Sequence, residues 1–146
     1  MTPLIRDNDL EILDHSFRLL VEKYKSLEAE HLEEQGLGHL SPAHVRALHR
    51  IGFSRRERMT NLARHLRLTV GTLTSTIDQL VKKGYVQRDR PDEDRRVVEV
   101  ALSENGHCVF EQIQISKRRV AENIFGRLNN EERAALRELL TKLSRE

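Results

Sequence analysis

The sequence predicts a mainly α fold of the α+β class, with helices along most of the 146 residues and one β-hairpin between them. Apolar residues recur at helical spacing through most of the chain, and two segments rich in β-branched residues flank a polar turn. The chain holds only 3 Pro and 7 Gly, too few for a many-turned all-β fold. Aromatic residues make up 4% of the chain and Trp is absent, which predicts an aliphatic core.

The first predicted helix covers residues 8–34, and Gly36 and Gly38 are expected to end it. Its apolar residues alternate at spacings of three and four, which places them on one stripe. The stripe consists of Leu10, Leu13, Phe17, Leu20, Tyr24 and Leu27. So long a helix at the start of a small chain is expected to pack on something besides its own domain.

A second helix is predicted over residues 42–52, because Ser41 is a suitable N-cap and Pro42 fits the first helical turn. Gly52 is expected to end this helix. Its expected buried residues are Val45, Leu48 and Ile51.

Two further helices follow without a linker. Thr60 is expected to cap a short helix, and Thr69 a longer one over about residues 70–83 that Gly84 closes. The buried residues expected in the two helices are Leu62, Ala63, Leu66, Leu73, Ile77, Leu80 and Val81. Two such short amphipathic helices need a third helix to cover them, and residues 42–52 supply it. The three together predict a helix-turn-helix.

A hairpin and two helices complete the chain. Strands are predicted at 85–88 and 97–102 on either side of a polar turn, and Ser103 is expected to cap a helix that reaches about Leu128. Its residues expected to face a partner are Phe110, Ile113, Val120, Ile124 and Phe125. Asn129 or Asn130 is expected to cap the last helix. Its residues expected to point inward are Leu136, Leu139, Leu140 and Leu143.

The exposed face of the predicted 70–83 helix carries short polar side chains. Its members are Gly71, Thr72, Thr74, Ser75, Asp78 and Gln79. Thr and Ser are poor helix formers, so their presence favours a functional reason. Short side chains let a helix lie deep in the major groove of DNA, where hydroxyls bond base edges. The alternative is a Thr-rich surface helix of no special purpose.

The predicted hairpin tip mixes three arginines with three acids. Arg90, Arg95 and Arg96 stand beside Asp92, Glu93 and Asp94. We expect an Asp to hold an Arg in one rotamer, aimed at a narrow minor groove. The alternative is a solvated loop with an internal salt bridge. From Arg55 to Arg96 the chain has 11 Lys or Arg and 6 Asp or Glu, a basic middle that suits a polyanion.

The chain from Leu62 to Gly106 resembles the MarR family of bacterial regulators. The residues that carry the resemblance are the 70–83 helix, Leu80-Val81-Lys82-Lys83-Gly84-Tyr85-Val86, and Asp94-Arg95-Arg96 leading to Leu102-Ser103. Ser103 stands where Thr is commoner in the family, and Val70 where Pro often follows the N-cap. The resemblance implies a winged-helix homodimer that binds double-stranded DNA, with Arg96 in the minor groove, Asp94 as its orienting partner and Arg95 on the backbone.

Taken together, the pattern and the resemblance give one set of DNA-binding residues. They are Arg55, Thr69, Gly71, Thr72, Thr74, Ser75, Gln79, Lys82, Arg90, Asp94, Arg95 and Arg96. Arg55 and Lys82 are expected to contact phosphates. The expected organisation is an N-terminal dimerisation helix (1–40), a winged helix-turn-helix (41–103) and C-terminal dimerisation helices (104–146).

A hydrophobic effector is expected where the dimerisation helices meet the winged region. Its expected lining is Phe17, Leu20, Tyr24, Val45, Leu48, Phe110 and Ile113, and the alternative is that all seven are plain core. Thr69 to Thr74, with Asp94 to Val98, is similar to the FabT-like branch that represses fatty-acid synthesis genes. That likeness implies a long-chain acyl effector, whereas the wider family implies a phenolic one.

Other classes of function fit the sequence less well. An enzyme would need a nucleophile with a base, paired carboxylates or a phosphate loop, and none has a signature here. The histidines lack metal-ligand spacing, so no cofactor or metal is expected. Cys108 is expected to be a small buried hydrophobe, although a redox- or metal-responsive regulator of the same fold stays an alternative. A winged helix that binds protein instead of DNA is a second alternative. No segment predicts a signal peptide or a membrane span, so we expect a cytoplasmic protein.

Overall fold

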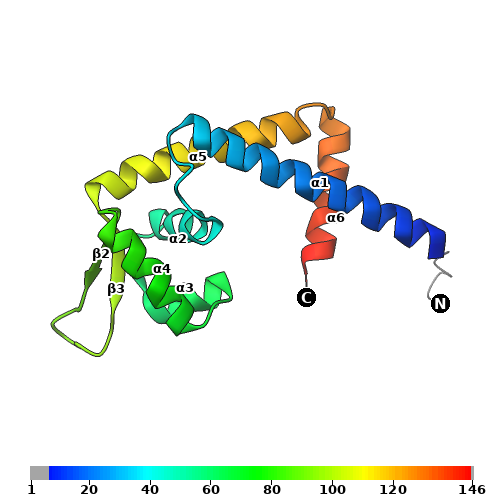
Figure 1. The fold of residues 1–146 in the computed structure, drawn as a ribbon. Coiled ribbons are helices and arrows are strands. Elements are labelled where there is room, and N and C mark those ends of the chain that lie inside the picture. The colour runs from blue at the N-terminus through cyan, green and yellow to red at the C-terminus, as the bar shows by residue number, and fades with distance from the viewer. Residues whose placement is uncertain (1–6, 146) are drawn as a thin grey trace. The chain divides into compact units, whose positions relative to one another are not determined.

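The structure is a computed structural model that describes residues 7–145. The elements are α1 (Asp7–Glu34), α2 (Pro42–Gly52), β1 (Glu57–Arg58), α3 (Met59–Leu66), α4 (Val70–Lys82), β2 (Val86–Asp89), β3 (Glu99–Leu102), α5 (Glu104–Phe125) and α6 (Asn130–Ser144) (Figure 1). The predicted fold class, mainly helical with one small sheet, is confirmed. Within the described residues no helix is both long and apolar enough to cross a membrane.

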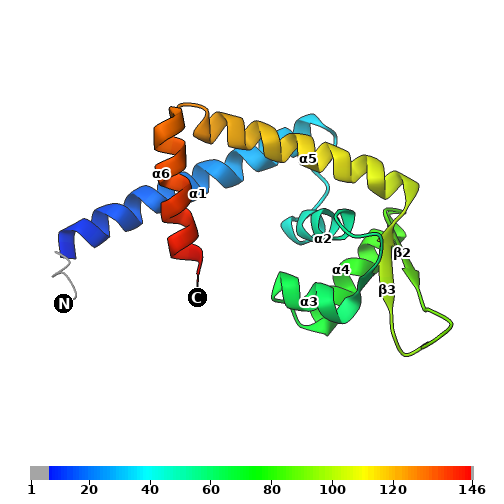
Figure 2. The same cartoon turned by 180° about the vertical axis from the view of Figure 1, so that it is seen from behind.

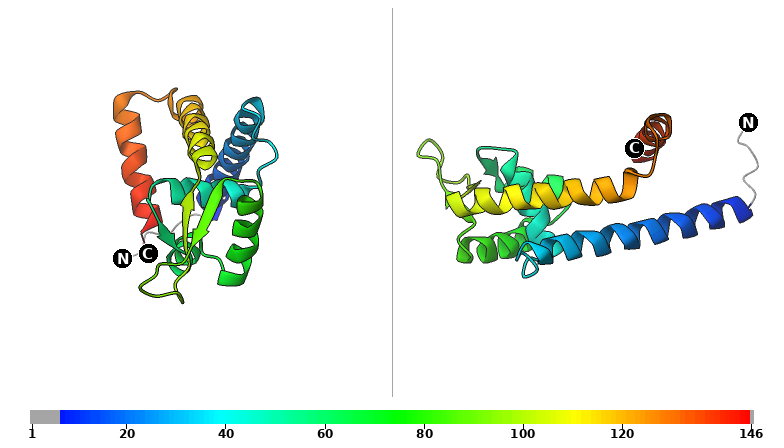
Figure 3. Two further views of the ribbon diagram at one scale, coloured as in Figure 1. Left: turned by 90° about the vertical axis from the view of Figure 1, so that its left-hand side faces the viewer. Right: turned by 90° about the horizontal axis from the view of Figure 1, so that it is seen from above.

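The chain forms two compact units, each described by itself below. The mixed unit is Leu32–Ser116, and the helical unit is Met1–His31 with Lys117–Glu146. The aliphatic core lies in the mixed unit. Its fully buried side chains include Val45, Leu48, Ile51, Leu62, Leu73, Ile77, Leu80, Val100 and Ile113. In the helical unit Val120 is fully buried, and the Lys117 ammonium lies 3.6 Å from the Glu28 carboxylate, where α5 runs beside α1 (Figure 3).

The sheet is antiparallel, in the order β1-β3-β2. β1 was not predicted: Glu57 and Arg58 pair with Val100 and Glu99 in a segment for which the sequence predicted neither helix nor strand. β2 and β3 form the predicted hairpin, whose turn extends away from α3 and α4 (Figure 2). β3 begins two residues later than predicted, because the Val97 N–H donates to the Asp94 carbonyl and so belongs to the turn.

Most predicted helix caps are confirmed. The Ser41 hydroxyl accepts from the His44 N–H, the Thr69 hydroxyl accepts from the Thr72 N–H, and Gly84 follows α4 with a φ of +81°. Thr60 as the cap of α3 is wrong. The N-cap is Arg58, because the pairing of β1 continues to the Met59 N–H, which donates to the Val98 carbonyl at 3.0 Å, and α3 starts there.

The buried face of α4 is rotated slightly from the prediction. Leu73, Ile77 and Leu80 are buried as expected, but Thr76 is also buried and Val81 is exposed. Val81 lies about 80° around the helix from Leu73, because each residue turns an α-helix by about 100°. It therefore falls outside the face that α2 and α3 cover.

Two predictions about α5 and α6 need correction. α5 ends at Phe125 and not near Leu128, and its Ile113 and Val120 are buried within the chain, so neither faces a partner. Asn129 is the cap of α6, as one of the two alternatives proposed. The four leucines of α6 do not point into a core of this chain. Leu136 is half-buried, and Leu139, Leu140 and Leu143 are exposed.

Candidate nucleic-acid interface

The surface of α4 opposite its buried face is a polar stripe. It consists of Thr72, Ser75, Gln79 and Lys82, at spacings of three, four and three, and all four are exposed. The chain enters α4 through Arg67, whose left-handed backbone (φ 54°) turns it away from α3. With Thr69 as N-cap, the first turn of α4 leaves its amides at the surface, a place that suits a negatively charged group.

The hydroxyl groups near the start of α4 differ in their remaining capacity to donate or accept hydrogen bonds. The Thr74 hydroxyl donates to the Val70 carbonyl at 2.7 Å, and the Thr69 hydroxyl donates to the Thr72 oxygen at 2.9 Å. Thr74 therefore presents a methyl group and an acceptor. The Ser75 hydroxyl has no hydrogen bond within the described part of the chain, so it is available both to donate and to accept. Gly71 has open space where a side chain would be.

Two residues in the second half of α4 are tied to other elements. Asp78 forms a salt bridge with Arg88 of β2, which joins α4 to the sheet. Gln79 is tied to α2, since its Oε1 lies 2.6 Å from the Nε2 of His44. The sequence reasoning missed His44. Its signal was the Ser41-x-x-His44 spacing of a capping box, in which Glu or Gln is the usual fourth residue.

The turn between β2 and β3 holds one arginine in a defined place. Asp94 accepts from the Arg96 Nε at 3.0 Å, from its Nη2 at 3.3 Å and from its backbone N–H at 3.1 Å. These bonds from Arg96, with the charge of nearby Arg58, hold the pKa of the Asp94 carboxyl below its ordinary value. The Arg96 side chain is 92% exposed, so a fixed cation stands on the outside of the turn.

The other basic residues of the predicted set lie around this turn and beside α4. The Arg90 guanidinium donates to the Arg95 carbonyl at 2.9 Å, so it braces the turn. Arg95 is exposed, with its Nη1 3.9 Å from Asp92. Arg55 and Lys82 are exposed, before β1 and at the end of α4. The structure thus brings the predicted DNA-binding residues together on the mixed unit.

Arg56, which the sequence reasoning did not select, clamps the base of the hairpin. Its Nη1 lies 3.2 Å from the Asp89 carboxylate and 3.6 Å from that of Glu99. These two acids face each other as the last pair of the β2–β3 ladder. The clamp fixes where the ladder stops and the turn begins.

The seven predicted effector residues are divided between the two units. Val45, Leu48 and Ile113 are fully buried in the core of the mixed unit, and Phe110 is half-buried against Phe53 and His49. The remaining three lie on α1 in the helical unit. Phe17 and Leu20 are exposed, and Tyr24 is half-buried, with the pKa of its phenol raised by burial and by Glu28.

Two further expectations concern cysteine and metals. The prediction that Cys108 is buried is wrong, since it lies on the exposed side of α5. Within residues 7–145, no group of three or more His, Cys, Asp or Glu side chains is placed to hold a metal ion.

Known proteins share this arrangement of α4 and the hairpin turn. The model of the MarR family matches residues 40–98, which span α2 to the end of the hairpin turn. The structure of a cysteine-to-serine mutant of Escherichia coli MarR with operator DNA is 27% identical, covers 94% of this chain and 97% of that one, and has a TM-score of 0.78. The chain carries the winged helix-turn-helix region of the MarR family at residues 40–98. It is therefore a DNA-binding transcriptional regulator and not an enzyme.

Two other proteins are similar to this chain over most of its length. The uncharacterized HTH-type transcriptional regulator YwhA of Bacillus subtilis is 24% identical over 136 residues, 93% of this chain and 95% of its own length. Streptococcus pneumoniae FabT, solved in complex with DNA, has a TM-score of 0.81 at 24% identity and covers 92% of this chain and 94% of that one. At this identity, the FabT structure supports the fold alone.

Proposed function

We propose that the protein is a homodimeric repressor that binds a pseudo-palindromic operator. The observation that carries the proposal is the pairing of two surfaces on one unit: the polar stripe of α4 and the Arg96 cation fixed by Asp94. In this arrangement α4 enters the major groove, where the unbonded Ser75 hydroxyl and the Thr74 methyl group meet base edges. Arg96 enters the adjacent minor groove. Arg55 and Lys82 contact phosphates on either side.

The structure of E. coli MarR with operator DNA supports this mode of binding. A dimer offers two copies of α4 to two half-sites, and half-sites about one helical turn apart place both copies on one side of the duplex. A dimer that covers a promoter in this way excludes polymerase, and repression is the output we propose.

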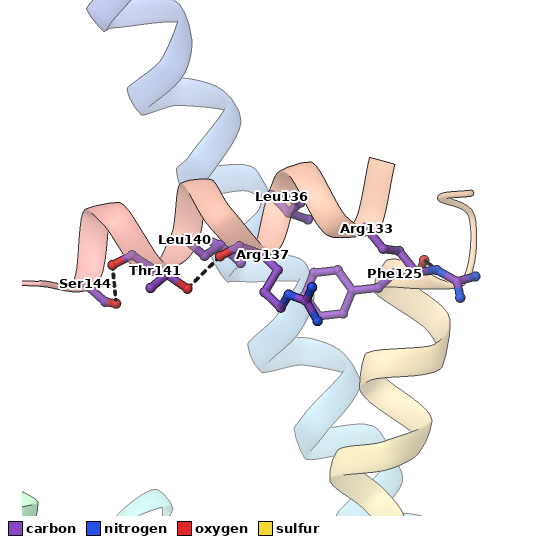
Figure 4. A pocket seen from close by; sticks show the side chains of 7 residues that line it. All are labelled: Phe125, Arg133, Leu136, Arg137, Leu140, Thr141 and Ser144. Atoms are coloured by element: carbon purple, nitrogen blue, oxygen red, sulfur yellow. Dashed lines mark hydrogen bonds between the residues drawn. The ribbon is translucent and has the colours of Figure 1, made fainter. Parts of the chain in front are cut away.

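The homodimer is supported by the exposed apolar side chains of the helical unit. On α1 they are Leu10, Ile12, Leu13, Phe17, Leu19 and Leu20, and on α6 they are Leu139, Leu140 and Leu143. Figure 4 shows a pocket of the helical unit that is lined by Phe125 of α5 and by residues of α6, among them Leu136 and Leu140. Monomeric proteins rarely expose contiguous apolar surface on this scale, so we assign these residues to a second copy of the chain.

Sedimentation of the full chain tests the dimer. Two 17.0 kDa chains should sediment together, and Leu139→Glu combined with Leu143→Glu should shift the equilibrium to monomer. Ala134→Glu is the matched control, because Ala134 is exposed on the opposite side of α6. A monomeric wild-type chain, or a double variant that stays dimeric, would contradict the assignment.

Selection of bound fragments from the source genome tests the operator. Purified dimer should enrich sequences with two inverted half-sites upstream of genes, and a reporter placed behind them should be less active when the regulator is present. Enrichment without inverted symmetry would contradict the mode of binding. A reporter activated by the regulator would contradict repression.

We further propose a hydrophobic effector, with an acyl chain preferred over a phenol. The apolar side chains of Phe17 and Leu20 on α1 support it, because both are exposed in the single chain. An effector acts only by its different affinity for the DNA-binding and non-binding states, with a coupling of about 1–3 kcal/mol. Titration of acylated carrier protein and of salicylate-type phenols, in separate operator-binding assays, tests the class. A change below about threefold with both would remove the effector from the proposal.

A further inference from the structure

A buried histidine of α2 holds one residue of the polar stripe on α4. His44 is only 6% exposed, and its Nε2 lies 2.6 Å from the Oε1 of Gln79. Gln79 is itself exposed, so its side chain is held by His44 at one end and faces solvent at the other. Among the stripe residues, and within the described chain, Gln79 alone is hydrogen-bonded to another helix.

The ring nitrogens of His44 have fixed roles. The Ser41 backbone N–H donates to the His44 Nδ1 at 3.1 Å, as the second half of the capping box that starts α2. An Nδ1 that accepts carries no proton, so the neutral ring carries its proton on Nε2. The Nε2–H therefore donates to Gln79. The start of α2 selects the tautomer, and the tautomer fixes the Gln79 amide.

A fixed Oε1 leaves the other end of the Gln79 amide to meet the solvent. With its oxygen bound to the ring, the exposed end is the NH₂ group, which only donates. Gln79 stands ten residues after the Thr69 cap, about 15 Å along α4. Recognition helices read bases with their N-terminal residues, so a donor this far along lies beside the backbone. Lys82, one turn further on the same stripe, adds a cation there.

We propose that Gln79 donates to a DNA phosphate and that His44 is the positioning residue that turns the Gln79 amide to do so. The inference rests on the proposed binding mode and adds one phosphate contact to it. Gln79 contributes to affinity for every DNA sequence, whereas Ser75 and Thr74 carry the sequence preference.

Gln79→Glu separates the phosphate contact from a structural role. The new carboxylate still accepts from the His44 ring, so the thermal midpoint should not fall. The outward NH₂ becomes an oxygen, which repels phosphate. Affinity should fall by more than about tenfold per half-site, and by the same factor for operator and unrelated DNA, because a bond to a charged phosphate is lost. Gln79→Ala should lose less affinity than Gln79→Glu, and again by the same factor for operator and for unrelated DNA.

Gln114→Glu is the matched control. The Oε1 of Gln114 on α5 lies 2.9 Å from the Nε2 of His49 on α2. This is the same kind of histidine–glutamine pair as His44 with Gln79, but its glutamine is on α5 and not on α4. Its affinity for both DNAs should equal that of the wild type. If wild type and Gln114→Glu bind no DNA, the proposed function fails. If both bind and Gln79→Glu binds equally well, only the present inference fails. A loss confined to the operator would make Gln79 a base reader and would also overturn it.

Two changes at His44 test its positioning role. His44→Met fills the space without polar atoms, and should weaken binding to both DNAs about as much as Gln79→Ala. In His44→Gln the amide offers an acceptor to Ser41 and a donor to Gln79, so affinity should return to within about twofold of wild type. The positioning role is overturned if His44→Gln folds but binds as weakly as His44→Met. It is also overturned if His44→Met folds and binds like wild type.

Discussion

Replacement of Arg96 by Ala should weaken operator binding without weakening the fold. The Arg96 side chain is 92% exposed, and its guanidinium donates hydrogen bonds to Asp94, two residues earlier in the same turn. It contributes nothing to the core, so the thermal midpoint of Arg96→Ala should match that of the wild type. Whatever is lost is then a loss of DNA contact.

The size of this loss follows from one groove contact per wing. A well-placed side chain in a DNA groove contributes about 1–3 kcal/mol, so a dimer with two wings should lose about 2–6 kcal/mol. This corresponds to a fall in affinity of at least about 30-fold. Asp94→Ala leaves the cation in place but lets it rotate, so it should lose only about threefold per half-site, or about tenfold for the dimer.

Fluorescence anisotropy of labelled operator at one fixed salt concentration measures all three proteins. The expected order of affinity is wild type, then Asp94→Ala, then Arg96→Ala. Arg95→Ala is the neighbouring comparison: its exposed guanidinium is expected on the DNA backbone, so its loss should weaken binding to operator and to unrelated DNA by the same factor. An Arg96→Ala dimer that binds within about twofold of wild type would refute a minor-groove role for this residue.

Two further predictions concern stability and pH. Gly106→Ala places a Cβ onto the Tyr85 carbonyl oxygen and should destabilise the fold by about 3 kcal/mol or more. Gly71→Ala meets open space in a helix and should stabilise the fold by up to about 1 kcal/mol. Urea unfolding measures both changes in the free energy of unfolding. The pKa of Asp94 is lowered in the folded chain, so its pairing with Arg96 is complete above the ordinary carboxyl value and is lost only as pH falls through the lower folded value. An NMR titration of the Asp94 carboxyl should therefore show a midpoint below about 3.9 that rises toward this value in Arg96→Ala. A wild-type midpoint at or above the ordinary value would contradict the pairing.

The features that sequence predicted well are those that depend on neighbours in the chain. The caps at Ser41 and Thr69 and the turn at Gly84 each need only residues three or four positions away. The pairing of Asp94 with Arg96 is equally local, because the two side chains are two residues apart. Local chemistry of this kind can be read directly from the sequence.

The features that sequence missed are set by contacts between distant residues. β1 is two residues long and exists only because β3, about 40 positions later, offers it a partner. The burial of Thr76 in place of Val81 depends on the rotation of α4 against α2 and α3, which periodicity alone does not fix. Val45, Leu48 and Ile113 have the composition of a pocket lining and of a core alike, and the packing made them core.

The same separation between local and distant contacts has a consequence for how this regulator can change over evolutionary time. The β-ladder stops at the clamped pair Asp89–Glu99, and within residues 90–97 hydrogen bonds join residues of the turn to one another. Insertions, deletions and substitutions between residues 90 and 97 are therefore nearly neutral for folding, whereas most changes on the inner side of α4 are not. In the binding mode proposed above, a descendant can explore new flanking sequences through this turn after a gene duplication, while α4 stays fixed. The turn is also the place where a designer can graft a different minor-groove reader onto the chain.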